Sequence, residues 1–238
     1  MRIASVLLVA VILTTCAISG TFAKYVTTAD GSNTARVAKW GVKISGMANS
    51  LFSQTYAKDT ETTIANTVAA SEEVVAPGTK NDTGVTFSLT GTPEVAVKID
   101  FVVKGSASDD ITDVVLPAGT YTDWTQAPYS GTFTLADPYN PVVFTLKDGA
   151  TTLKTGTLAQ IEEFLEGKTD KYAPGTDLSG ILGGTSGTYT LTWAWAFEVN
   201  DKADTLLGNL AEGTLQSPIS GASTSIDFAI AITVTQID

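Results

Sequence analysis

Regular alternation between apolar and more polar residues is the feature that most restricts what this chain can fold into. Successive side chains of a β-strand point to opposite faces, so alternation predicts strands with one buried face. The pattern predicts central strands at residues 95–103, 187–199 and 224–236, and further strands at 40–44 and 85–89. The apolar face of the first of these consists of Val95, Val97, Ile99, Phe101 and Val103.

Local signals complete the expected fold. Asp148-Gly149 lies between two apolar runs and is typical of a β-hairpin. Apolar residues at helical spacing predict a helix over 158–167, with Thr157 and Gln160 as a capping box, and a second short helix is expected over 202–210. We therefore expect an all-β fold, an antiparallel β-sandwich of jelly-roll type with one or two short connecting helices.

The first 23 residues have the composition of an export signal. Arg2 precedes an apolar run over residues 3–18, and small residues follow it, so cleavage is expected between Ala23 and Lys24. The run is shorter than the roughly 20 apolar residues of a membrane span. We expect a signal peptide at 1–23, an N-terminal segment at 24–46 and a jelly-roll domain at 47–238. The protein should be secreted and should work outside the cell or at the cell surface.

Composition excludes several classes of chemistry. The chain has no histidine, and its one cysteine, Cys16, lies in the expected leader. The remaining chain therefore has no disulfide, no thiol nucleophile, no Ser-His-Asp triad and no histidine zinc site. The formal net charge of −11 becomes −12 when Arg2 is removed, which argues against nucleic acid and anionic lipid as partners. We expect no enzyme activity, no cofactor and no small-molecule substrate.

Both ends of the chain resemble the TasA and camelysin proteins of Gram-positive bacteria. The leader ends in Gly20-Thr21-Phe22-Ala23 and is followed by Lys24-Tyr25-Val26 and a polar stretch. The runs at 192–198 and 200–209 and the closing strand at 226–238 are also similar, whereas residues 105–185 are not covered. The resemblance implies a leader removed by a SipW-type signal peptidase and a secreted jelly-roll subunit of biofilm-matrix fibres. Camelysin-type proteins have been described as metal-dependent proteases, and the absence of histidine excludes a zinc protease here.

The resemblance also implies assembly by donor-strand exchange, in which the N-terminal segment of one subunit completes a sheet of the next. The residues agree with this, because a polar stretch at 24–35 precedes a clean alternating strand. The alternative is an ordinary first strand paired within its own domain. The expected partners are other copies in a head-to-tail homopolymer and the signal peptidase, and further matrix proteins or polysaccharide are left open. The expected donor-strand anchors are Val37, Trp40, Val42 and Ile44.

A rival hypothesis is a secreted carbohydrate-binding β-sandwich. Tyr121, Trp124 and Tyr129 lie in a loop-like region and could present aromatic faces to a sugar. Trp193 and Trp195 lie on an apolar strand face and are expected in the core. Two short acidic clusters, at 108–113 and 200–204, offer oxygen ligands to calcium, although neither matches an EF-hand loop. No pair of carboxylates is marked out as the acid and base of a glycosidase.

Overall fold

The computed structural model describes residues 36–46, 51–52, 57–58, 73–106, 108–122, 131–197, 199–213 and 219–237. The chain divides into two compact units, Met1–Val37 and Ala38–Asp238, and the second unit holds every strand and helix described below. The expected leader and the cleavage site at Ala23 and Lys24 lie outside the described residues. In the part of the chain that is described, no helix has the length and apolar character needed to cross a membrane.

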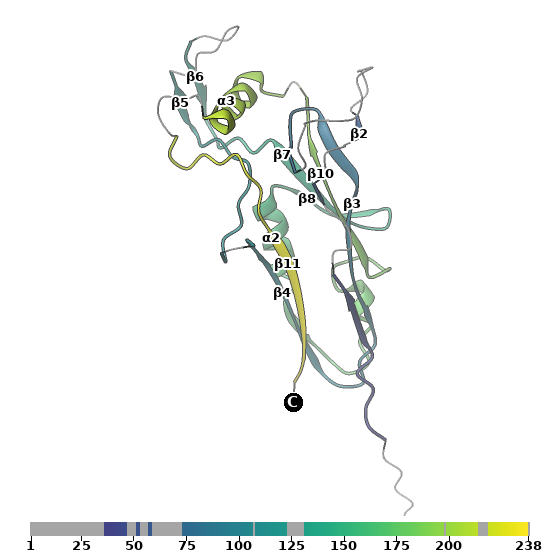
Figure 1. Ribbon diagram of the computed structural model, residues 1–238. Coiled ribbons are helices and arrows are strands. Elements are labelled where there is room, and N and C mark those ends of the chain that lie inside the picture. The colour runs from purple at the N-terminus through teal and green to yellow at the C-terminus, as the bar shows by residue number, and fades with distance from the viewer. Residues whose placement is uncertain are drawn as a thin grey trace, which may run out of the picture. The chain divides into compact units, whose positions relative to one another are not determined.

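The second unit is built mainly from two antiparallel sheets (Figure 1). The larger is six-stranded, in the order β1 (Val42–Ser45), β3 (Thr79–Gly91), β10 (Thr188–Trp195), β7 (Val142–Asp148) and β8 (Thr151–Gly156), with β2 (Ala57–Lys58) also paired to β3. The smaller has the order β11 (Ala229–Gln236), β4 (Val97–Lys104) and β9 (Asp170–Tyr172), and β5 (Gly119–Tyr121) forms a separate hairpin with β6 (Phe133–Leu135). The predicted all-β class is confirmed, whereas jelly-roll topology stays a prediction.

The core consists of the inward faces of both sheets, as the alternation predicts. On β4 the four residues Val97, Ile99, Phe101 and Val103 are at most 2% exposed, and β4 is the central strand of its sheet. Trp193 and Trp195 of β10 are 2% and 6% exposed, which confirms their expected place in the core. The indole N–H of Trp193 donates to the carbonyl of Leu51 over 2.9 Å, so this buried polar group is satisfied.

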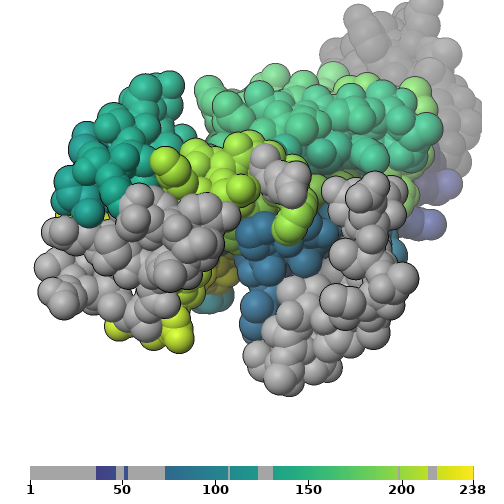
Figure 2. Space-filling view, turned by 90° about the horizontal axis from the view of Figure 1, so that it is seen from above, coloured from purple at the N-terminus to yellow at the C-terminus, as the bar shows by residue number. Residues whose placement is uncertain are grey.

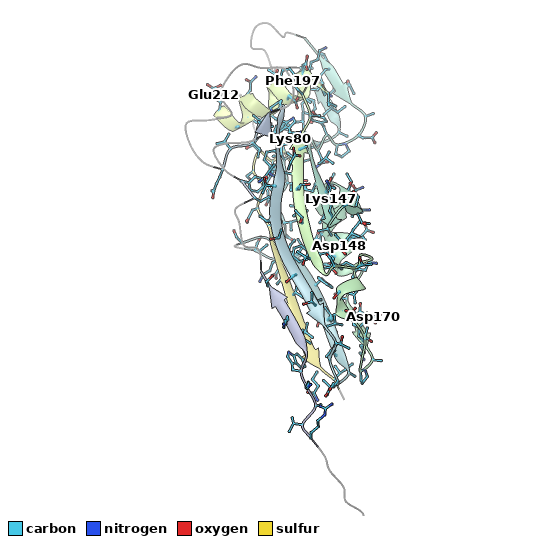
Figure 3. The ribbon with its side chains drawn as sticks, turned by 90° about the vertical axis from the view of Figure 1, so that its right-hand side faces the viewer. Lys80, Lys147, Asp148, Asp170, Phe197 and Glu212 are labelled. Atoms are coloured by element: carbon cyan, nitrogen blue, oxygen red, sulfur yellow. The ribbon has the colours of Figure 1, made fainter. Side chains whose placement is uncertain are left out.

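Two strand predictions were wrong in part. Strand β10 ends at Trp195, and the next two apolar residues of the alternating run, Phe197 and Val199, are 63% and 65% exposed. Figure 3 shows Phe197 beyond the end of the strand, near Lys80. Strand β11 was expected to be central, but it is the last strand of its sheet among the described residues. Alternation shows which face is buried, and it carries no information on the number of neighbouring strands.

Both predicted helices are present. Helix α2 (Leu158–Glu166) begins at the predicted capping box, in which the Thr157 hydroxyl accepts from the amide of Gln160 and the Gln160 side chain accepts from the amide of Thr157. It packs against β4, β7 and β8. Helix α3 (Asp201–Glu212) is capped by Asn200 at its start and by Gly213 at its end, and the φ of Gly213, 74°, is left-handed. Figure 2 shows α3 in the middle of the face seen from above. A short 3₁₀ helix, η1 (Leu178–Gly180), precedes β10.

Asp148 fixes the loop that leads into β10. Its carboxylate lies at the end of β7, is 5% exposed, and accepts from the amides of Thr185 and Ser186, the latter over 2.9 Å. The Ser186 hydroxyl is a third donor. Burial raises the pKa of Asp148, but the hydrogen bonds from Ser186, Thr185 and Gly187 outweigh burial and hold the pKa below its ordinary value. The ionised carboxylate is therefore part of the native fold.

We expect Asp148→Ala to lower the free energy of unfolding by about 2–4 kcal/mol at pH 7, because the backbone amides and the Ser186 hydroxyl that donate to the carboxylate lose their acceptor. The folded-state pKa is depressed, so this contribution is present above the unfolded pKa of about 3.9 and is lost as the pH falls towards the folded pKa. Urea unfolding at pH 7 and pH 2.5 checks both points, with the exposed Asp137→Ala as control. A difference between wild type and Asp148→Ala that is as large at pH 2.5 as at pH 7 would contradict the assignment.

Candidate assembly site

The structure places two of the expected donor-strand anchors, Val42 and Ile44, in β1 at the edge of the larger sheet. Trp40, which was expected in the same strand, precedes β1. Strand β1 pairs with β3 of the same chain, with Val42 opposite Gly91 and Ile44 opposite Leu89. This is the ordinary intradomain pairing that the sequence left open as the alternative to donation. Val37, in the N-terminal unit, is 92% exposed, Trp40 and Ile44 are each 43% exposed, and Val42 is half-buried. Donation to a second copy stays a prediction.

The pairing between β1 and β3 is short. The ladder covers four residues, and the Ser45 and Ser88 hydroxyls lie 2.7 Å apart. Upstream of β1, the amide of Lys39 donates to the Glu94 carboxylate over 2.8 Å, and the amide of Glu94 donates to the carbonyl of Lys39 over 3.2 Å. Each such exposed hydrogen bond contributes only about 0.5–1.5 kcal/mol net. Strand β1 is therefore among the elements that can open locally without unfolding the core.

Two glycines allow β1 to approach β3. Gly41 and Gly91 have φ angles of 65° and 120°, in the region that favours glycine. A Cβ atom on Gly91 would overlap the carbonyl oxygen of Gly41, and a Cβ atom on Gly41 would lie 2.6 Å from the carbonyl oxygen of Thr92. A side chain at either position would therefore separate the two segments.

We expect Gly91→Ala to release β1 from β3. Trypsin should then cleave after Lys43 about fivefold faster or more, since a loss of about 1–2 kcal/mol in the closed state raises the open population by that factor. Gly46→Ala is the matched control, because a Cβ atom there meets nothing within 4 Å. Mass spectrometry of the early digest measures the cleavage rate, and equal rates for the two variants would show that β1 is not held in this way.

The inward face of the sandwich is incompletely covered along β11. Ile230, Ile232 and Val234 lie opposite Val103, Phe101 and Ile99 of β4 on the same face of the sheet. The three β4 residues are at most 2% exposed, whereas the three β11 residues are only half-buried. The covered core therefore ends at β11. In the described part of the chain, no strand pairs with the other side of β11, and we call this side its open edge.

A helix covers part of the opposite side of the sandwich. Helix α2 packs against β7 and β8 of the larger sheet and against β4 of the smaller one. On the β9 side of β4, the amide of Phe101 donates to the Thr169 hydroxyl over 3.0 Å, and the amide of Val103 lies 3.5 Å from the Glu166 carboxylate. Helix α2 thus packs against both sheets near their β8 and β9 ends, and the opposite ends of the two sheets are β1 and β11.

The inward apolar face of β1 is also partly exposed, like that of β11. Ile44 lies opposite Leu89, which is fully buried, yet Ile44 is 43% exposed. Two terminal strands of different sheets therefore both leave their inward apolar faces partly open.

The sequence around β1 is basic, although the chain as a whole is acidic. Residues 31–46 contain Arg36, Lys39 and Lys43 and no acidic residue, so they carry a charge of +3. The whole chain carries −11, which leaves −14 for the other residues. We call residues 31–46 the basic arm. A basic arm and an acidic body attract each other between copies.

Of the three residues in the rival sugar-binding hypothesis, Tyr121 is the one that the structure describes. The Tyr121 ring packs against Phe133 with centroids 5.2 Å apart, and its hydroxyl donates to the carbonyl of Pro117 over 2.5 Å. Tyr121 is half-buried by these contacts. Trp124 and Tyr129 lie outside the described residues.

Two of the acidic residues considered as calcium ligands have structural roles. Asp113 accepts from the amides of Val114 and Leu158 over 2.8 and 3.2 Å and so fixes the start of α2. Asp204 accepts from the Tyr139 hydroxyl and the Trp195 indole over 2.8 and 3.2 Å. Burial raises the pKa of both carboxyl groups, and the hydrogen bonds partly offset this effect. Among the residues that the structure describes, no three His, Cys, Asp or Glu side chains are grouped as a metal site.

A comparison with family models finds no match to this chain, and comparisons with curated proteins and with solved structures find no similar protein either.

Proposed function

We propose that this protein is a secreted structural subunit of an extracellular or cell-surface filament, of the kind that forms a biofilm matrix. In this proposal the N-terminal strand of one jelly-roll subunit adds to an exposed sheet edge of the next. The observation that carries the proposal concerns the two ends of the sheets. Helix α2 packs against both sheets at one end, and at the other the sheets end in two partly exposed strands, β1 and β11. The resemblance of the chain ends to TasA and camelysin proteins supports the matrix setting.

The mode of addition determines the type of assembly. The donor strand and the acceptor edge are different surfaces, so the contact is heterologous, and heterologous contacts that do not close into a ring give an open filament. The main-chain hydrogen bonds of an added strand supply affinity, and its alternate side chains supply specificity. Trp40, Val42 and Ile44 are suited to the second role because none of them is fully buried in its own chain.

We expect the double substitution Trp40→Asp with Val42→Asp to abolish filament formation and to leave a soluble subunit. Two carboxylates cannot be placed against an apolar sheet face without a large desolvation cost. The matched control is Val102→Asp with Val143→Asp, since these residues are 42% and 41% exposed on the outward faces of β4 and β7. Negative-stain electron microscopy and sedimentation provide the measurement, and intact filaments from the first variant would refute strand donation by β1.

A deletion tests the whole proposal. Residues 24–238 at high concentration should form filaments, and residues 47–238 should not. The deletion leaves the buried core in place, because the buried apolar residues of the described chain all lie between Leu51 and Leu207. Circular dichroism of both proteins controls for folding. A chain of residues 24–238 that stays monomeric at every concentration would overturn the filament proposal.

A further inference from the structure

We propose that the open edge of β11 is the acceptor, and that its occupant is the strand formed by residues 38–45 of a second copy. The inference rests on the proposed filament function and names the surface that the function uses. Three observations support it. They are the uncharged, regular sequence of β11, the incomplete burial of its inward apolar side chains, and the positive charge of the basic arm.

The edge of β11 lacks the usual protection of an edge strand. Its sequence AIAITVTQ contains no charged residue, no proline and no glycine, and all of its eight residues pair regularly with β4. Natural proteins generally protect long edge strands with lysine, proline, bulges or a covering element. An unprotected edge of this length is suited to pairing with another strand.

The inward face of β11 has apolar side chains that its own chain covers only in part. Ile230, Ile232 and Val234 are half-buried, although their β4 partners are buried. Residues 38–45 of a second copy would place three apolar side chains of the same period next to them, namely Trp40, Val42 and Ile44. These eight residues match the length of β11, whereas only four are paired on β3. Transfer to β11 can therefore double the length of the ladder.

The other described edges fit a donor less well. Strand β9 has three residues, and β8 carries Lys154 and lies against α2. The edge of β3 that faces β1 is paired with β1 of the same chain, and exchange of β1 onto β3 of a second copy would restore only the same four-residue ladder. Of the strands that the structure describes, β11 thus offers the longest continuous edge that is not already paired.

Charge favours the arm of another copy as the occupant. The basic arm carries +3 and the rest of the chain −14, so an arm is attracted to the body of a second copy. The β11 edge is neutral and does not repel Lys39 or Lys43. Thr233 is exposed on the outward face of β11, where a charge would lie beside the outward lysines of an added strand.

Disulfide trapping identifies the acceptor directly, because residues 24–238 contain no cysteine. A Lys43→Cys copy is mixed with a copy that carries Ala231→Cys, Thr233→Cys or Thr235→Cys, three exposed outward positions that sample the register. The comparison copy carries Thr90→Cys, which lies opposite Lys43 in the intrachain pairing. Filaments are formed, oxidised and digested, and mass spectrometry quantifies the linked peptides. We expect the cysteine introduced at position 43 to be linked to at least one β11 position, well above its linkage to position 90.

The outcomes separate the two proposals. Linkage between copies to position 90 and not to β11 would show that β1 is exchanged onto β3, which overturns the β11 acceptor and leaves the filament function standing. Filaments without linkage to any β11 position would also overturn the acceptor. Failure of residues 24–238 to form filaments under any condition would overturn the filament function itself.

A charge pair at one exposed position gives a second test. Thr233→Lys should raise the concentration needed for filament formation about tenfold, because it adds a positive charge and an edge lysine where the basic arm would pair. Thr233→Glu introduces a side chain of similar size and opposite charge and should leave that concentration unchanged or lower it at low salt. Light scattering measures the threshold, and equal effects of the two substitutions would refute pairing of the arm at β11.

Discussion

A β-sandwich must close its sides, and this constraint organises the structure. The last strand of each sheet has one row of backbone N–H and C=O groups without a strand partner and an apolar face that only another element can cover. Here α2 meets the constraint on one side, where it packs against both sheets. On the other side the sheets end in β1 and β11, and the exposure of Ile44 beside the buried Leu89 shows how abruptly the covered core stops.

The sequence predicted the features that depend on neighbouring residues. The faces of β4 and β10 follow from alternation, and α2 follows from its capping box and apolar spacing. The lateral order of strands depends on pairing between distant segments, so the sequence could not show that β11 lies at an edge. It could not show the exposure of Phe197 either, because the alternation continues beyond the point where the chain leaves the sheet.

The anchors show the same division between local and distant information. The sequence identified Trp40, Val42 and Ile44 as one strand face, and the structure places β1 as a strand with Ile44 turned towards the sandwich. Which chain receives that strand depends on relative free energies that no local pattern contains. A strand that donates must also leave its first partner, and a four-residue ladder with exposed hydrogen bonds keeps the free-energy cost of this step small.

Charge explains how assembly can be selective in an acidic protein. Copies of residues 24–238 carry a net charge of −12 and repel each other, and this repulsion disfavours contacts between two acidic surfaces. A contact made by the basic arm is attractive instead, because it places a segment of charge +3 against the acidic remainder of another copy. The neutral sequence of β11 then adds no local repulsion at the point of pairing. In the proposed assembly, long-range charge would select the arm, and the open edge and half-buried face of β11 would select the place where it pairs.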